Sequence, residues 1–72
     1  MDENFYHKYY WNSKDDLNTL SYLVNDLSGL LKGDALKVKG NLKDVLSVYK
    51  KIKKICDISI DELEFLVNEK TF

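Results

Sequence analysis

The chain has 72 residues and a formal net charge of −1 at pH 7, with 44% hydrophobic and 32% charged residues. This length excludes a second domain, because compact domains rarely fall below about 50 residues. The composition excludes a disordered tail, but a core this small contributes only a few kcal/mol of net stability. Because this net stability is low, stabilisation of the fold by a partner or by self-association is compatible with the composition.

Amino-acid usage is biased in ways that bear on origin and on ligands. All eleven basic residues are lysine, and arginine, proline and glutamine are absent. The bias indicates an AT-rich genome, such as that of a low-GC bacterium or a phage, and it removes the side chain best suited to phosphates and guanine edges. A single cysteine, an acidic N-terminus and the lack of a long apolar run predict a cytoplasmic protein without disulfide, signal peptide or membrane span.

Residues 1–12 form a segment dense in aromatic side chains. The spacing of these aromatic side chains fits a helix and a strand equally well. In a helix Phe5 and Tyr9 share one face, whereas in a strand alternate residues share one side. Acidic residues at positions 2 and 3 suit a helix N-terminus, which favours a short helix. We expect this segment to pack across the rest of the domain. Two interpretations stay open: the aromatic side chains complete the core, for which Trp11 is well placed, or they form a binding surface.

Residues 13–33 carry apolar side chains at intervals of three and four, which predicts an amphipathic helix. Ser13 is a good N-cap, and Gly33 supplies a stop after the helix. Tyr22 falls on the polar side and is expected to be exposed. The next stretch, residues 34–40, alternates like a strand but has no pairing partner, so a loop or one helical turn is predicted.

Two further helices are predicted in the second half of the chain. Residues 41–56 have an apolar face wide enough to contact two neighbours, with Asn41 as the N-cap. Ser59 begins a Ser-x-x-Glu capping box, which predicts a helix over 59–70 that turns back sharply against the preceding one. The expected fold class is all-α: a small bundle of three main helices with the aromatic segment as a short fourth helix.

The stretch KIKKICDISIDEL, residues 51–63, resembles the closing segment of lambda-repressor-type helix-turn-helix domains. In that family the end of a helix, a short turn and a Ser-x-Asp-Glu-Leu helix start recur. The resemblance implies a turn just before Ser59. It includes no counterpart of the family's recognition helix, so no function is carried across.

Two sets of surface side chains are candidates for binding. Exposed Tyr and Trp are the usual anchors of protein interfaces. The expected partner-binding residues are Tyr6, Tyr10, Trp11, Tyr22 and Phe65. A lysine face of the 41–56 helix, formed by Lys43, Lys50 and Lys54, could contact nucleic-acid phosphates. A sequence pI near 5.7 and the missing arginine favour an ordinary solvated face instead.

No catalytic, cofactor or metal site is expected. His7 and Cys56 are the only residues of their kinds, and no Cys/His cluster or phosphate-binding glycine loop is present. The sequence therefore predicts a non-enzymatic interaction module that binds another protein or itself, of the phage or bacterial regulator, inhibitor or immunity-protein type. The alternatives are a nucleic-acid-associated regulator using the lysine face and a non-catalytic subunit of a larger complex.

Overall fold

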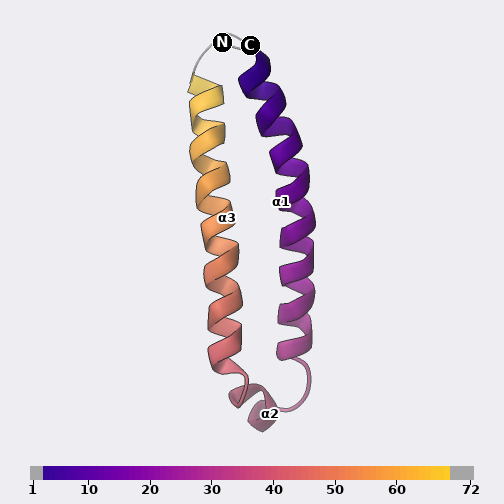
Figure 1. The fold of residues 1–72 in the computed structure, drawn as a ribbon. Helices are drawn as coiled ribbons and strands as arrows, with labels where there is room; N and C mark the ends of the chain where they lie inside the picture. Colours follow the sequence, from indigo (N-terminus) through magenta and orange to yellow (C-terminus); the bar gives the residue numbers. More distant parts are fainter. Residues whose placement is uncertain (1–2, 69–72) are drawn as a thin grey trace.

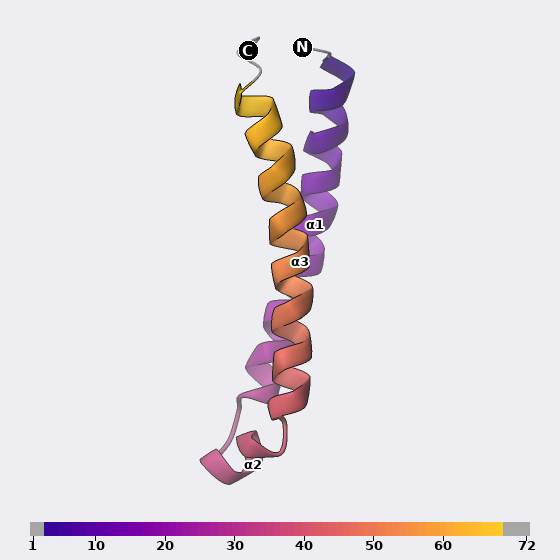
Figure 2. The same ribbon diagram turned by 90° about the vertical axis from the view of Figure 1, so that its left-hand side faces the viewer.

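The computed structural model describes residues 3–68 as a helical hairpin. Helices α1 (Glu3–Leu30) and α3 (Leu42–Asn68) run antiparallel, and α2 (Ala35–Lys39) is a short turn of helix at the closed end (Figure 1). The two long helices stay side by side when the molecule is turned (Figure 2), and the rod measures 53 × 17 × 13 Å. The all-α prediction is confirmed, and the described residues contain no strand.

The closed end is held by local contacts that the sequence indicates in part. Residues 34–40 form the predicted helical turn, in which the Asp34 side chain accepts a 2.9 Å hydrogen bond from the Lys37 amide. Gly33 has a φ of +108°, a left-handed conformation that favours glycine. The Asn41 side chain does not cap α3 as predicted. Instead its amide donates a 2.9 Å hydrogen bond to the Leu30 carbonyl, which ties the end of α1 to the start of α3.

The first correction concerns the N-terminal half. The aromatic segment is not a separate fourth helix, because its described part is continuous with the predicted 13–33 helix in α1. Ser13 lies inside α1, where its Oγ donates a 2.7 Å hydrogen bond to the Tyr10 carbonyl. No glycine or proline precedes Gly29, so nothing in this stretch stops a helix once it has started.

The second correction concerns the turn predicted before Ser59. Residues 42–68 form one continuous helix, so the predicted 41–56 and 59–70 helices are merged, and residues 69–70 lie outside the described part of the chain. Lys53 Nζ and Asp57 Oδ2 form a 2.7 Å ion pair one helical turn apart, just before the predicted turn. The hydrogen bond to Asp57, reinforced by the carboxylate's charge, raises the pKa of Lys53.

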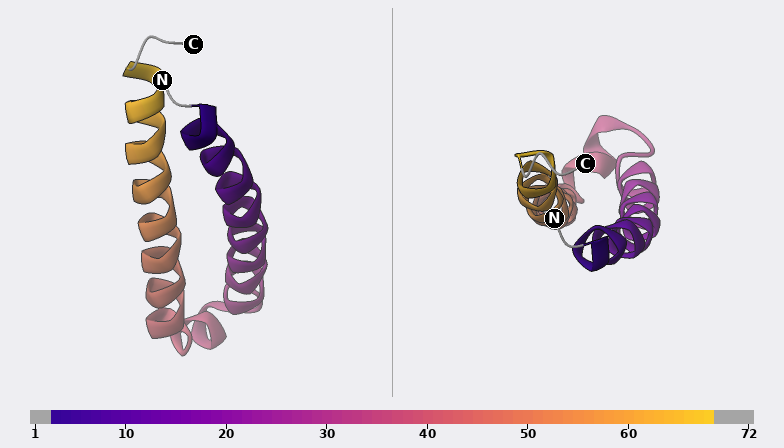
Figure 3. Two further views of the ribbon diagram at one scale, coloured as in Figure 1. Left: turned by 45° about the horizontal axis from the view of Figure 1, so that its top comes forward. Right: turned by 90° about the horizontal axis from the view of Figure 1, so that it is seen from above.

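The core is a single seam between α1 and α3. Its buried cluster consists of Leu23, Leu27, Val45 and Val48 near the closed end, and Leu66 is buried nearer the open end. Among the described residues no large side chain is completely enclosed. Seen along its length (Figure 3), the described part of the molecule has no third long helix beside this pair. Each long helix therefore covers only one side of its neighbour.

Candidate protein-binding face

Apolar side chains that the α1–α3 seam leaves uncovered recur every seven residues. The row on α1 is Tyr10, Leu17, Val24 and Leu31, and the row on α3 is Leu42, Tyr49, Cys56 and Leu63. Seven residues correspond to two turns of a slightly supercoiled helix, so each set forms a straight line along its helix. Each row spans about 32 Å, because its first and last residues are 21 positions apart in a helix.

The two rows lie on the same side of the hairpin. One open groove is lined by Leu17 from α1 and by Cys56 and Ile60 from α3, and a second is lined by Tyr6 from α1 and by Leu63 and Val67 from α3. We call the surface that these rows and grooves form the apolar face. It consists of Tyr6, Tyr10, Leu17, Val24 and Leu31 from α1 and of Leu42, Tyr49, Cys56, Ile60, Leu63 and Val67 from α3.

Most side chains of the apolar face are too exposed to belong to the core of the hairpin, and Cys56 is half-buried. Leu17 is 59% exposed, Val24 55% and Val67 71%. A scattered exposed leucine is ordinary, but a continuous apolar strip is characteristic of an interaction surface.

The opposite side of the hairpin is more polar. Its grooves are lined by residues that include Lys8, Asn12 and Glu62 toward the open end and Asp26 and Asp44 toward the closed end. Asp26 follows Leu17 by nine residues, which places the two on opposite sides of α1. This side also carries exposed Phe5, Ile58 and Phe65, so the two sides of the hairpin differ in degree.

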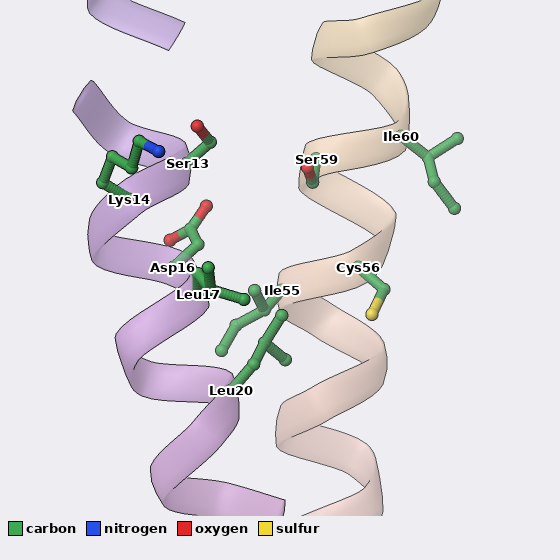
Figure 4. A pocket seen from close by; sticks show the side chains of 9 residues that line it. All are labelled: Ser13, Lys14, Asp16, Leu17, Leu20, Ile55, Cys56, Ser59 and Ile60. Carbon is green, nitrogen blue, oxygen red and sulfur yellow. The ribbon is translucent and has the colours of Figure 1, made fainter. Parts of the chain in front are cut away.

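A polar break interrupts the seam near its middle. Ser13, Asp16 and Ser59 are half-buried there, and their short side chains leave an open groove of about 430 Å³. Figure 4 shows Leu20 and Ile55 converging between the helices beside this gap, with the polar side chains further along the seam. Polar positions within an apolar seam lower stability and help to fix the register of paired helices.

The predicted partner-binding residues do not form one surface. Tyr6 and Tyr10 belong to the apolar face. Tyr22 and Trp11 lie eleven residues apart on the outer side of α1, away from α3. Phe65 packs against Phe5 across the open end, with ring centroids 4.9 Å apart.

The two outer aromatic residues, Tyr22 and Trp11, are both exposed, and only the exposure of Tyr22 agrees with its predicted packing. Tyr22 is 69% exposed, as the sequence predicts. Trp11 is 64% exposed and packs edge-on against the Tyr10 ring at 5.2 Å, so the prediction that it covers the core is wrong. The reason is the continuity of α1, which carries Trp11 outward along the helix instead of folding it back over the seam.

The lysine face lies elsewhere, on the outer side of α3. Lys43, Lys50 and Lys54 are all exposed, and together with Lys51 they surround a shallow groove. This placement leaves them free to contact solvent or a polyanion, and it separates them from the seam.

Within residues 3–68, no group of three or more His, Cys, Asp or Glu side chains is arranged to hold a metal ion. The helices of this same stretch are also too polar or too short to cross a membrane. Comparison of the chain with protein-family models, with curated proteins and with solved structures found no match.

Proposed function

We propose that the chain is a non-enzymatic protein–protein interaction module that binds its partner through the apolar face. The observation that carries the proposal is the two rows of largely exposed apolar side chains, one from each long helix, on the same side of the hairpin. Removing this surface from water is favourable by about 25 cal/mol per Å² of apolar area. A complex in which a partner covers the face gains this free energy of burial, whereas the isolated hairpin does not.

The shape of the face favours a macromolecule over a small ligand. Small-molecule sites are concave and enclose most of their ligand. The grooves on this face are open and follow one another along the space between α1 and α3. Figure 4 shows one of them. Such a surface is complementary to another helix or helix pair, whose side chains interdigitate with the exposed rows. We extend the proposal to regulators, inhibitors or immunity proteins that cover a partner's surface, an extension that rests on size and fold class.

Val24→Lys tests the proposed face, because it places a charge in the α1 row at a position outside the buried core. We expect the variant to lose the proteins, or the second copy, that the wild-type chain retains in co-purification. Tyr22→Lys is the matched control, since it introduces the same charge on the outer side of the same helix. Loss of binding in Tyr22→Lys with retention in Val24→Lys would contradict the proposal.

A second candidate function is nucleic-acid association through the lysine face, favoured by the gathering of four lysines around one groove. Binding through phosphates alone weakens steeply with salt. We expect duplex DNA to bind at physiological salt with a dissociation constant above about 10 µM, in the non-specific range. Tight, salt-sensitive binding in a fluorescence-anisotropy titration, abolished when Lys43, Lys50 and Lys54 are changed to Glu, would make this the leading function.

A further inference from the structure

We infer that the apolar face is covered by a second copy of the chain, so that two hairpins pair through it as a symmetric four-helix bundle. The inference rests on the proposed function, since it takes the apolar face to be a protein-binding surface. It goes further by naming the partner, and four observations support it: exposed area, helical repeat, charge and length.

The exposed area of the chain exceeds that of a compact monomer. The hairpin exposes 5915 Å². A compact protein of 8.4 kDa exposes about 4,600 Å², so the excess is about 1,300 Å². Two copies that each bury this excess form an interface of about 2,600 Å² in total, which lies within the range of about 2,000–5,000 Å² for obligate homodimers. The excess is therefore large enough for a homodimer interface.

The helical repeat is that of a bundle with more than two helices. A two-stranded seam requires two apolar positions in every seven, whereas a helix that contacts two neighbours requires three. Near the closed end α1 has three in each repeat, as in Leu20, Leu23 and Val24. Leu23 is buried against α3, whereas Val24 is exposed on the apolar face. The third position is thus unpartnered in the single hairpin and is occupied when a second hairpin packs on it.

The charge of the apolar face permits pairing with an identical surface. A two-fold interface brings the same patch of both copies together, so a net charge on it would be repulsive. One groove on the face is lined by one lysine and one aspartate, Lys14 and Asp16, whose charges offset each other. Lys53, which precedes Ile60 by seven residues at the edge of the face, is already paired with Asp57 at 2.7 Å.

The length of the face also matches a second copy. Each apolar row spans 21 residues of helix, or about 32 Å at 1.5 Å per residue, and an identical hairpin is long enough to cover both rows. With full overlap, the middle of one hairpin lies against the middle of the other, whether the copies run parallel or antiparallel. Cys56 lies close to the middle of α3 and belongs to the apolar face. The two Cys56 side chains of the dimer are therefore at the same level along the bundle.

Sedimentation equilibrium of the full chain tests the inference. We expect a mass of twice 8.4 kDa at micromolar protein concentration. Val24→Lys should raise the dimer dissociation constant by about 100-fold or more, because it buries an unpaired charge in the interface. Tyr22→Lys should leave the constant unchanged. A wild-type chain that stays monomeric, or a dimer weakened equally by both variants, would overturn the inference.

Cross-linking supplies a second measurement that needs no destabilising change. A short bifunctional maleimide should join two wild-type chains through Cys56, the only cysteine. The matched control is Cys56→Ser combined with Tyr22→Cys, which moves the thiol to the outer side of α1 and should remain uncross-linked. Efficient cross-linking of the control together with none of the wild type would place the interface on the wrong side of the hairpin.

The same variants separate this inference from the proposed function. If the wild-type chain is monomeric and helical but Val24→Lys still loses a co-purifying protein, the dimer is wrong and the protein-binding face stands. If the chain is monomeric and Val24→Lys changes no interaction, both are wrong.

Discussion

Leu27→Ala is expected to unfold most of the hairpin at room temperature. Leu27 is 8% exposed and packs with Leu23, Val45 and Val48 in the buried cluster. Truncating a buried leucine costs about 2–5 kcal/mol. A domain of this size rarely has more than about 3–5 kcal/mol from its core, so the loss is comparable with the whole free energy of unfolding. Thermal or urea unfolding followed by far-ultraviolet circular dichroism measures it.

The matched control is Tyr22→Ala, which truncates a larger side chain at a position 69% exposed. A surface change of this kind alters the free energy of unfolding by no more than about 0.5 kcal/mol. Both variants must be compared at one protein concentration, since association makes stability concentration-dependent. A stable Leu27→Ala with an unfolded Tyr22→Ala would show that α1 packs with its opposite side toward α3.

The buried positions were predictable because the seam imposes its own period on the sequence. Leu23 and Leu27 lie one helical turn apart, as do Val45 and Val48, and these side chains are apolar wherever the two helices meet. The exposure of Tyr22 follows from the same rule. Gly33 also marks the end of α1, because its φ of +108° is one that other residues rarely adopt.

Helix continuity was not predictable from capping residues alone. Ser13 and Ser59 are both good N-caps, yet each lies inside a long helix. Serine in a helix interior costs only a few tenths of a kcal/mol relative to alanine, whereas breaking the helix removes several backbone hydrogen bonds and shortens the seam. A capping signal starts a helix only where the preceding chain is unable to be helical. Within residues 3–68, such interruptions occur only around Gly33 and Gly40, between the two long helices.

The apolar face was missed for the same reason. The seven-residue spacing of Leu17, Val24 and Leu31 is visible in the sequence, and its partner row continues through Cys56 to Leu63 only if α3 is unbroken. A turn before Ser59 would have placed Leu63 on a different helix from Cys56. Of the five aromatic residues predicted to bind a partner, only Tyr6 and Tyr10 belong to the face.

Ile60→Pro distinguishes the continuous helix from the predicted break, because the two arrangements require opposite outcomes. In a helix capped by Ser59, position 60 is the first helical residue, where proline is favoured. Inside α3, proline at this position removes the hydrogen bond from its backbone nitrogen to the Cys56 carbonyl and its ring clashes with that carbonyl. We expect a loss of about 3 kcal/mol or more, which unfolds most of a chain this small.

Ile60→Ala is the control that isolates the backbone effect. It removes the same side chain but keeps the backbone N–H, and because Ile60 is already 48% exposed the expected cost is only about 1 kcal/mol. Thermal unfolding of the two variants at matched concentration gives the comparison. Equal stability of the proline and alanine variants would mean that a helix begins at Ser59 after all. In that case α3 is two helices and the row from Leu42 to Leu63 is broken. The apolar face that the dimer requires then does not exist.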